Sequence, residues 1–501
     1  MMNGQATASA GSSALIDALR AIVGPAGLLL GEDAAPYAQG ARYGAGQAAC
    51  VVRPASTAEV AQVVASCAAH GAQLVPQGAN TGLVGASTPD ASGTQVLLSL
   101  GRLRQRCELD AGNRSVAVHA GLRLHELNER LAPQQLWFPV DLAADPSIGG
   151  MVACNTGGTR LLRHGDVRHN LLALEVVLFD PPGEVVQLGK PLRKNNTGFD
   201  LMQLFVGTSG AAGVITGVTL ELAALPRQTV TALLVPSDDD AVATLLQAAE
   251  AELGDFLSAF EGISGAALQA ALHHVPTLRN PFGAEPVPPF SLLIELASGV
   301  APGAGVDLEA LLMGFLEPRL GGQLDNAVLG RGQDLWQLRH ALSDGAKARG
   351  QVVAFDISVR RSALMALRRE AAALVAQRFA PLQVLDFGHV GDGGLHFNLV
   401  WPHAQAASYD PALVAQVRDA IYALVVQGHG GSYSAEHGIG PHNIDYYRRY
   451  TPPAVLRWSG RLQAMLDPQG LGGSVRYGQD GAAGQLGPVG QTASSNAPQA
   501  A

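Results

Sequence analysis

Cysteine, aromatic side chains and charge are all scarce in this chain of 501 residues. The four cysteines, Cys50, Cys67, Cys107 and Cys154, form no CxxC pair, so the sequence contains no motif for an iron–sulfur cluster or a cysteine-type zinc site. No uncharged apolar run reaches the roughly 18 residues that a membrane-spanning helix needs. A net charge of −9 without a compensating basic stripe argues against nucleic acid as a partner.

The N-terminus also lacks the basic segment and unbroken apolar core of a secretory signal. Asp17 and Arg20 interrupt its apolar stretch at the spacing of an amphipathic helix. By elimination, we expect a cytoplasmic protein. The length of the chain predicts two or three domains, and the texture of the sequence changes after Pro226. We therefore expect a helical segment at 1–44, domains at 45–225 and 226–430, a C-terminal segment at 431–478 and a disordered tail at 479–501.

Local patterns predict several elements of these domains. A strand at 50–54 precedes a helix that begins with a Ser56/Glu59 capping box, and a second strand at 73–76 follows. The helix has the apolar stripe Val60, Val63, Val64 and Cys67. A Pro-Pro-Gly turn at 181–183 predicts a hairpin of 174–179 with 184–188. Acidic caps predict further helices at 241–253 and 411–427.

The loop PQGANTG at 76–82 follows the second of these strands and has only small or polar side chains. Such a loop lets backbone N–H groups approach a diphosphate, because no Cβ atom stands in the way. By itself, however, a glycine-rich loop is more often only a turn. It is neither a GxGxxG dinucleotide fingerprint nor a P-loop, so the spacing leaves both interpretations open.

The segment GHVGDGGLHFN at 388–398 contains the sharpest cluster of functional side chains. Asp392-Gly393 is a preferred pair for a two-residue type I′ turn, which would place His389 directly opposite His396 on one face, together with Asn398. The segment SAEHGIG at 434–440 adds a carboxylate and an imidazole. Two histidines and one glutamate with an open position describe a catalytic metal site. The histidine pair alone would be equally consistent with surface residues of a hairpin.

Three further segments are PSIGG running into NTGG at 146–158, LRKNNTGFD at 192–200, and 207–216. Together with the loop at 76–82 and the histidine segments, they resemble the vanillyl-alcohol-oxidase-type FAD family, most closely its D-2-hydroxyglutarate and D-lactate dehydrogenase branch. The resemblance covers 45–225 and 330–475. It implies an α+β fold, with a two-subdomain FAD-binding domain at 45–225 and an α/β substrate (cap) domain with an antiparallel sheet and a metal site at 226–430. Segment 431–478 would return to the FAD-binding domain.

By this resemblance, FAD would be bound by three groups of residues. The diphosphate would lie against Pro76, Gly78, Ala79, Asn80, Thr81 and Gly82, the isoalloxazine and ribityl chain against Pro146, Ser147, Gly149, Gly150 and Asn155, and the adenine end against Ile215. Covalent members of the family attach the flavin to a histidine or cysteine in such loops. Asn80 stands at the histidine position here, which predicts non-covalent FAD, with the nearby Cys154 as the residue to check.

The resemblance also assigns the chemistry. His389, His396 and Glu436 would bind a divalent metal, expected to be Zn²⁺, with Mn²⁺ or Co²⁺ as alternatives. His437 would handle the proton, Arg339 would bind the substrate carboxylate, and Ser343 and Asn398 would contact the substrate. The expected reaction is hydride transfer from C2 of a D-2-hydroxy acid to flavin N5, with the metal as Lewis acid. Electrons would pass to a quinone, an electron-transfer flavoprotein or a cytochrome rather than NAD, and the family suggests a homodimer.

The sequence departs from the family pattern at three places. Ala354 replaces a lysine that helps to bind substrate, which predicts a preference for acids with one carboxylate, such as D-lactate, over D-2-hydroxyglutarate. Lys347, Arg349 or Arg360 could compensate. Gly394 replaces an asparagine, and the segment 472–476 lacks the Asn-Pro of the family's C-terminal flavin contact.

Two alternatives remain open at this point. The chain could be the flavin subunit of a glycolate- or lactate-oxidising complex, which co-purification with an iron–sulfur partner would support. It could also be a flavin-free metallohydrolase, which a yellow purified protein would exclude.

Overall fold

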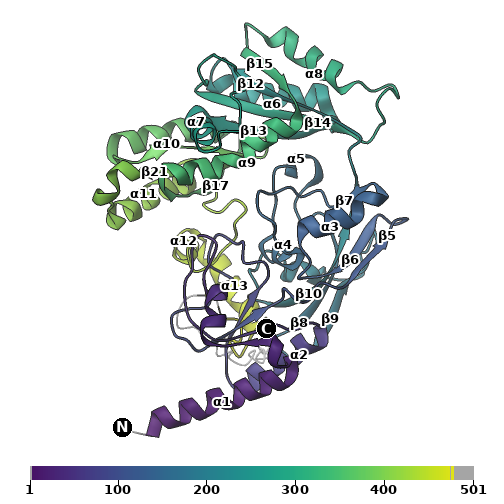
Figure 1. Ribbon diagram of the computed structural model, residues 1–501, viewed down its shortest axis with the longest axis vertical. Coiled ribbons are helices and arrows are strands. Elements are labelled where there is room, and N and C mark those ends of the chain that lie inside the picture. The colour runs from purple at the N-terminus through teal and green to yellow at the C-terminus, as the bar shows by residue number, and fades with distance from the viewer. Residues whose placement is uncertain (1–2, 474, 479–501) are drawn as a thin grey trace, which may run out of the picture.

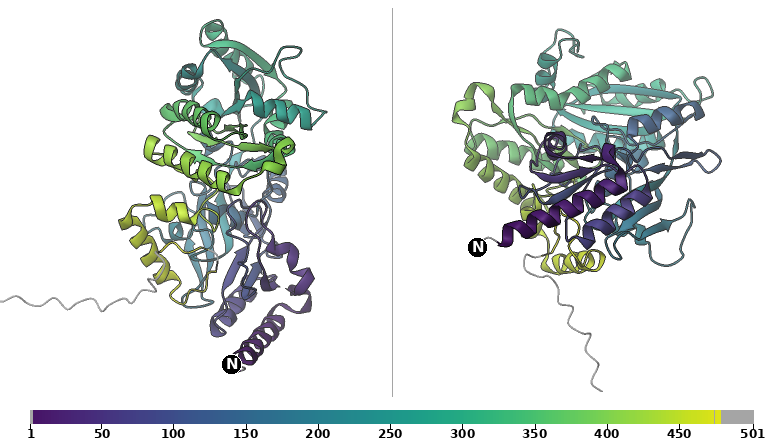
Figure 2. Two further views of the ribbon diagram at one scale, coloured as in Figure 1. Left: turned by 90° about the vertical axis from the view of Figure 1, so that its left-hand side faces the viewer. Right: turned by 60° about the horizontal axis from the view of Figure 1, so that its bottom comes forward.

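The computed structural model describes residues 3–473 and 475–478, so the tail expected to be disordered, residues 479–501, lies outside the described residues. The chain forms two lobes, one above the other in Figure 1. The lower lobe contains the N-terminal half of the chain and the C-terminal helices, and the upper lobe contains the part between them. Figure 2 shows from two further directions that the C-terminal helices lie against the N-terminal half.

The first sheet of the lower lobe has the strand order β1-β2-β4-β3. Its strands are β1 (Leu28–Leu29), β2 (Ala48–Val52), β3 (Leu74–Gln77) and β4 (Gln95–Ser99). Helices α1 (Asn3–Val23) and α2 (Thr57–Ala69) pack beside it. The capping box at α2 is confirmed in part: Ser56 accepts from the N–H of Glu59, but the Glu59 carboxylate accepts from Ala55, one residue early. The predicted stripe of α2 is buried, and each valine contributes about 1.5–3 kcal/mol.

The second sheet is antiparallel throughout, in the order β5-β6-β10-β8-β9. Its strands are β5 (Cys107–Asp110), β6 (Ser115–His119), β8 (Leu171–Leu178), β9 (Val185–Gly189) and β10 (Gly213–Glu221). The hairpin predicted from the Pro-Pro-Gly turn forms between β8 and β9. Between β6 and β8 the chain forms α3 (Leu124–Leu131), β7 (Leu136–Trp137), α4 (Ile148–Cys154) and α5 (Leu161–His164), and β7 pairs with β11 (Ala223–Ala224).

The upper lobe is built on a seven-stranded sheet in the order β15-β12-β14-β13-β19-β20-β17. Its strands are β12 (Gln228–Pro236), β13 (Leu257–Ser264), β14 (Phe290–Ser298), β15 (Leu324–Gly330), β17 (Asp356–Ser358), β19 (Phe387–Gly388) and β20 (Gly394–His396). Helices cover both faces, so the central strands β13 and β14 are buried on both sides. Leu234 of β12 packs into the core with α6 (Asp239–Leu253), α8 (Leu308–Leu316), α10 (Leu364–Arg378) and α11 (Pro411–Ala423). Its neighbour Leu233 packs into the core with α7 (Gly265–His274) and α9 (Gly332–Arg349).

A three-stranded sheet, β16 (Gly350–Val353), β21 (Leu399–Pro402) and β18 (Gln383–Val384), completes this lobe. Helix α11 begins at the predicted cap, because Asp410 accepts from the N–H of Ala412. It ends four residues before the predicted Gln427, and a π-helical turn, Leu424–Gly428, continues it. Such turns are frequent at functional sites. This one leads into the loop that carries Glu436 and His437.

The predicted register of the histidine hairpin is wrong. His396 lies opposite Phe387, two residues from the expected partner, and His389 lies in the turn rather than on a strand. Asp392 does not have the positive φ that a type I′ turn requires, whereas Gly393 does. Instead, the His389 carbonyl accepts from the N–H groups of residues 392, 393 and 394, and the Asp392 carboxylate accepts from Gly394. Since the slip is two residues, the side chains keep the same face.

The C-terminal segment contributes α12 (Ile444–Tyr450) and α13 (Pro453–Leu466), and it contacts the lower lobe at several points. His442 stacks on Tyr43 with ring centroids 3.5 Å apart, Gly472 forms a backbone bridge with Leu74, and Leu471 is part of the first core. Within the described residues, no helix combines the length and hydropathy that crossing a bilayer requires.

Candidate active site

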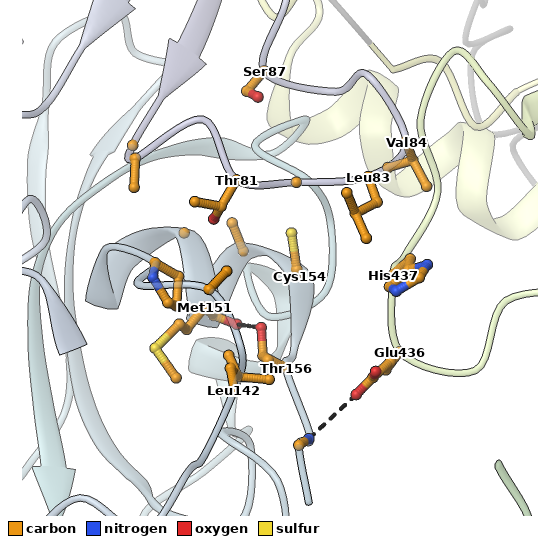
Figure 3. Close-up of a pocket in the computed structure, with 18 of the residues that line it drawn as sticks. Thr81, Leu83, Val84, Ser87, Leu142, Met151, Cys154, Thr156, Glu436 and His437 are labelled. Atoms are coloured by element: carbon orange, nitrogen blue, oxygen red, sulfur yellow. Dashed lines mark hydrogen bonds between the residues drawn. The ribbon is translucent and has the colours of Figure 1, made fainter. Parts of the chain in front are cut away.

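One cavity lies where the two lobes meet, and it is lined by residues from three separate parts of the chain. The lower lobe supplies the loops that follow β3 and precede α4, the upper lobe supplies α9 and the strands around β20, and the C-terminal loop supplies Glu436 and His437. Figure 3 shows Cys154 and Thr156 on one side, Leu83 and Val84 on another, and Glu436 and His437 projecting from the C-terminal loop. The structure therefore brings together motifs that are more than 300 residues apart.

The wall made by the lower lobe, here called the flavin wall, consists mostly of backbone and small side chains. All the residues of the loop at 76–82 line it, as do Pro146, Ser147, Gly149, Gly150 and Ile215. A Cβ atom on Gly78 would lie 2.0 Å from the Ser147 hydroxyl, and one on Gly149 would lie 2.5 Å from the Ala120 Cβ. These two glycines permit close packing of the wall itself. A Cβ atom on Gly82 would meet no atom within 4 Å.

Two residues shape this wall without large side chains. Ser147 caps α4 by accepting from the N–H of Gly150, at 3.3 Å. Asn80 has a φ of 55°, in the left-handed region that asparagine tolerates, and its amide donates to the Gln39 carbonyl and accepts from the Ser87 hydroxyl. The Asn80 side chain thus bonds to Gln39 and Ser87 rather than to the N–H groups of its own loop, which leaves these backbone donors for a diphosphate.

Asn155 is the one residue among those expected at the site that does not line the cavity. It ends α4 with a φ of 53°, its amide donates to Asp166 at 2.8 Å, and its side-chain oxygen accepts from the N–H of Arg168. These bonds fix the turn after α4. In its place Met151, Cys154 and Thr156 face the cavity.

The opposite wall, here called the chemistry wall, is dense in charged side chains. Arg339 and Ser343, one turn apart on α9, line it together with His389, His396, Asn398, Glu436 and His437. A buried carboxylate, Glu261 of β13, joins two of them. It accepts from Nε and Nη2 of Arg339 at 2.8 and 2.7 Å, and its other oxygen lies 2.7 Å from Nδ1 of His389. Glu261 therefore orients both the arginine and the imidazole.

The two imidazoles converge on one carboxylate oxygen. Oε1 of Glu436 lies 3.5 Å from Nε2 of His389 and 3.4 Å from Nε2 of His396, and the two rings are 5.2 Å apart. Ligand atoms bound to one tetrahedral zinc lie about 3.4 Å apart, given bonds of about 2.0–2.1 Å. The second Glu436 oxygen accepts from the N–H of Gly158 at 3.2 Å, which ties this loop to the flavin wall.

Asp356 of β17 contacts the loop that carries Glu436 and His437. One of its oxygens accepts from the N–H groups of Glu436 and His437, at 3.0 and 2.8 Å, and lies 3.4 Å from Nδ1 of His437. Asp356, His396, Glu436 and His437 could also hold a cation, since one ligand atom from each lies within 4.8 Å of the others. One Asp356 oxygen therefore positions the loop through two backbone N–H groups, whereas the other, Oδ1, lies 3.9 Å from Nδ1 of His396.

The electrostatics of the chemistry wall differ between His389 and His396. Burial opposes the charged form of His389, but Glu261 and Glu436 outweigh it and raise its pKa well above the ordinary value. Burial lowers the pKa of His396 to about 3, although Glu436 acts in the opposite direction. Burial would raise the pKa of Glu261, but His389 and Arg339 outweigh this effect and lower it to about 2. These shifts favour the charged forms of His389 and Glu261, which face each other, and the neutral form of His396.

Ala354 lines the cavity, but the three cations that the sequence offers as compensation do not. Lys347, Arg349 and Arg360 are exposed, and Lys347 forms an ion pair with Asp344 on the outer surface of α9. Arg42 lines the cavity instead.

Sequence reasoning missed Glu261, Asp356 and Arg42. The first two had a visible signal, because each is an acid within a run of apolar and small residues, SAFEG and VAFDI, where burial without a partner would be costly. Arg42 had none. It lies in a glycine-rich segment whose place beside the cavity depends on the tertiary fold.

Comparisons with known proteins identify the family and the fold of the chain. Residues 48–189 match a family model described as an FAD binding domain, and residues 225–472 match one described as the C-terminal domain of FAD linked oxidases. D-2-hydroxyglutarate dehydrogenase of Bos taurus, named as mitochondrial, is 34% identical, over 85% of this chain and 76% of the relative. D-2-hydroxyglutarate dehydrogenase of Stutzerimonas stutzeri is 31% identical, over 91% and 97%. D-2-hydroxyglutarate–pyruvate transhydrogenase of Saccharomyces cerevisiae is 30% identical, over 86% and 87%.

Solved structures share the fold at low sequence identity. Substrate-bound p-cresol methylhydroxylase superimposes with a TM-score of 0.70 at 15% identity, covering 92% of this chain and 95% of its own. The 4-ethylphenol oxidase of Gulosibacter chungangensis gives 0.68 at 17% identity, covering 93% and 97%. Both similarities concern the fold alone, and they confirm the expected α+β architecture of a flavin-binding domain with a cap domain.

Proposed function

This chain belongs to the FAD-dependent D-2-hydroxyacid dehydrogenases of the vanillyl-alcohol-oxidase-type family, and we propose that it oxidises a D-2-hydroxy acid to the 2-keto acid with the help of a divalent metal. The relatives suggest D-2-hydroxyglutarate as the first substrate to test. The observation that carries the proposal is the convergence of His389, His396 and Glu436 directly beside His437, in a cavity whose other wall is a glycine-rich cradle.

The flavin wall suits FAD because it offers backbone donors and little bulk. Residues 78–82 would hold the diphosphate, and the start of α4 from Ser147 to Gly150 would lie along the ribityl chain. When bound, FAD supplies a hydride acceptor. The chain contributes a fixed wall that would hold the flavin, so that the substrate carbon could be held against the flavin from the other side.

The chemistry wall suits a divalent metal because its donor set is two imidazoles and a carboxylate, with Glu261 orienting one imidazole from behind. When bound, such a metal supplies a Lewis acid for the 2-hydroxyl and carboxylate groups of the substrate. Zn²⁺ is the first candidate, with Mn²⁺ and Co²⁺ as alternatives. Glu261, Asp356 and the Gly158 N–H keep the three donor side chains in place.

The remaining residues handle the proton and position the substrate. His437 would accept the hydroxyl proton as the C2 hydrogen leaves with its electron pair, and Asp356 beside its Nδ1 would stabilise the imidazolium. Arg339 and Ser343 on α9, with Asn398 opposite, would align the acid. Glu261 holds the Arg339 guanidinium in one orientation before substrate arrives.

Electrons would leave to an acceptor other than NAD, such as a quinone, an electron-transfer flavoprotein or a cytochrome, and the yeast relative named as a transhydrogenase supports an organic acceptor as well. The two flavin family matches leave no ground for a flavin-free metallohydrolase. A role as the flavin subunit of a larger complex would use the same chemistry, and co-purification would distinguish it.

A substrate panel with an artificial dye acceptor tests the proposal. The purified yellow protein should be reduced by D- but not L-2-hydroxy acids under anaerobic conditions, and added dye should reoxidise it. Reduction should disappear on chelation and return with added Zn²⁺, Mn²⁺ or Co²⁺. If no D-2-hydroxy acid bleaches the flavin of the metal-loaded protein, the proposed function is wrong.

A further inference from the structure

Helix α13 carries an apolar stripe on its outer surface. The members of the stripe, with their exposed fractions, are Val455 (49%), Trp458 (63%), Leu462 (38%) and Met465 (57%). Their spacing of three, four and three residues places them on one face of the helix. Among the described residues, every other helix or strand carries at most one comparably exposed large apolar side chain. Figure 2 shows the yellow C-terminal helices at the edge of the lower lobe in both views. A stripe of this kind marks an interaction surface.

The charges beside the stripe are all positive. Arg457 and Arg461 are exposed, and at 3.6 residues per turn both lie along one edge of the stripe. Within the described residues neither pairs with a carboxylate, whereas the arginines of α12 form ion pairs with aspartates. The Arg461 guanidinium lies 5.7 Å from the centre of the Trp458 ring. Since α13 contains no acidic residue, this face is cationic in a chain whose net charge is −9.

An anionic bilayer fits this face better than a second copy of the chain does. A helix with arginines beside an apolar face that includes tryptophan and leucine is typical of helices that lie in the plane of a membrane surface. Tryptophan favours the level of the lipid headgroups, and anionic lipids attract arginine. In a pair of α13 helices, by contrast, the arginines of each copy would meet no acid on the other, because the helix has none.

The opposite face of α13 leads inward toward the cavity. The Gln463 side chain donates to the Val475 carbonyl and accepts from the Tyr477 N–H, both at 2.8 Å. The Tyr477 ring packs edge-on against Tyr447 of α12, with ring centroids 5.4 Å apart. Burial raises the pKa of Tyr477, and the nearby Cys154, which lines the cavity, adds to this effect. A bilayer at the exposed face would therefore be separated from this side of the cavity by α13 and the segment 475–478.

We propose that the exposed face of α13 binds the surface of a membrane that contains anionic lipids. Trp458 and Leu462 enter the headgroup region, and Arg457 and Arg461 lie at the lipid phosphates. The helix lies in the plane of the membrane surface and does not cross it. This inference goes beyond the proposed oxidation, because it concerns where the enzyme meets its electron acceptor, and it favours an acceptor dissolved in lipid, such as a quinone.

Tryptophan fluorescence and sedimentation with vesicles test this proposal on the full chain. Trp458 is the most exposed of the four tryptophans, so its emission should move to shorter wavelength when vesicles of phosphatidylcholine and phosphatidylglycerol are added. The shift should disappear in Trp458→Phe, which keeps an apolar side chain. Vesicles of phosphatidylcholine alone should bind at least about tenfold more weakly, and salt should weaken binding to the mixed vesicles.

Variants separate the apolar and the charged contributions. Leu462→Gln should weaken vesicle binding about tenfold, and the double variant Arg457→Gln with Arg461→Gln should weaken it about 10- to 30-fold. Leu311→Gln is the matched apolar control, because Leu311 is 39% exposed on α8 of the upper lobe. Arg349→Gln removes one exposed charge from α9 and controls for net charge. Both controls should bind vesicles within twofold of wild type.

Three results overturn membrane binding by α13. The first is no shift and no sedimentation with the mixed vesicles at low salt, and the second is equal binding by Leu462→Gln and Leu311→Gln. The third is a Trp458 emission that is already that of a buried indole without vesicles. If it depends on protein concentration, a second copy covers the face, and if it does not, another part of the same chain does. Flavin reduction by D-2-hydroxy acids is measured without vesicles, so either proposal can fail while the other stands.

Discussion

The two walls of the cavity would bind their ligands by different means. The flavin wall uses backbone: its loop at 76–82 and the start of α4 carry few large side chains, and Gly78 and Gly149 allow these segments to pack closely. The chemistry wall uses side chains that hold one another, as Glu261 holds both Arg339 and His389. Damage to the first wall should therefore act through shape and change cofactor affinity. Damage to the second should remove charge or a donor atom and change the chemistry while the flavin stays bound.

The chemistry wall is also the more fragile of the two. Its buried charges are compensated only by one another, and removal of one partner from a buried ion pair costs about 3–5 kcal/mol. The flavin wall has no such interdependence, because a backbone N–H survives most substitutions. Variants that separate the two walls test this comparison, beginning with those expected to have the largest effect.

Loss of a metal ligand should have the largest effect. His389→Ala, His396→Ala or Glu436→Ala should lower turnover by about 10³-fold or more, because a bound metal supplies several kcal/mol of transition-state stabilisation. Metal analysis should show its loss, whereas the flavin absorbance should stay near that of wild type. His403→Ala, an exposed histidine of the same lobe, is the control. A variant that loses flavin together with metal would contradict the separation of the two walls.

Removal of the proton acceptor comes second. His437→Ala should slow flavin reduction by about 10²–10⁴-fold, the usual contribution of a positioned general base, with the metal content unchanged. Stopped-flow reduction and metal analysis on the same preparation check this. Loss of metal would instead place His437 among the ligands, where the cluster of Asp356, His396, Glu436 and His437 would allow it.

The residue behind the ligands should matter less. Glu261→Gln keeps the shape of the side chain but removes the charge that faces His389 and Arg339, so metal affinity or activity should fall about 10- to 100-fold. Glu295→Gln is the matched control: Glu295 is equally buried on the neighbouring strand β14, but it bonds to Trp336 and Arg160 rather than to a metal ligand. Equal losses in the two variants would mean a structural role only.

A substitution on the flavin wall should change affinity rather than chemistry. Gly78→Ala places a Cβ atom against the Ser147 hydroxyl, which caps α4, and the crowding should weaken FAD binding by about tenfold. Titration of the apoprotein with FAD measures this, and the reconstituted variant should keep its metal. Gly299→Ala, where a Cβ atom meets nothing within 4 Å, is the control. Loss of metal with flavin retained would reverse the expected pattern.

The sequence predicts the two walls unequally well. The buried stripe of α2 and the loop at 76–82 could be predicted from local patterns, because residues close together in sequence determine a helix face or a glycine-rich loop. The register of the histidine hairpin could not be predicted in this way, since it depends on three N–H groups that donate to the His389 carbonyl. Glu261 lies 128 residues from His389, and no local pattern joins them. The capping role of Asn155 was hidden for the same reason, because Asp166 and Arg168 meet it only after α4 has formed.

The smallest effect is expected at Cys154, whose sulfur projects into the cavity in Figure 3. A covalent bond to flavin would require a nucleophile in the flavin wall. Burial raises the pKa of the Cys154 thiol to about 11, so about one molecule in 10⁴ carries the thiolate at pH 7. Asn80 offers an amide that is already bonded to Gln39 and Ser87. Acid precipitation should therefore release all the yellow colour into the supernatant. Cys154→Ala should bind FAD and turn over within about twofold of wild type, because it removes one sulfur atom that forms no disulfide. Colour that stays in the wild-type pellet but not in the pellet of Cys154→Ala would show a thioether to the flavin, and a side chain rather than the backbone would then anchor the cofactor.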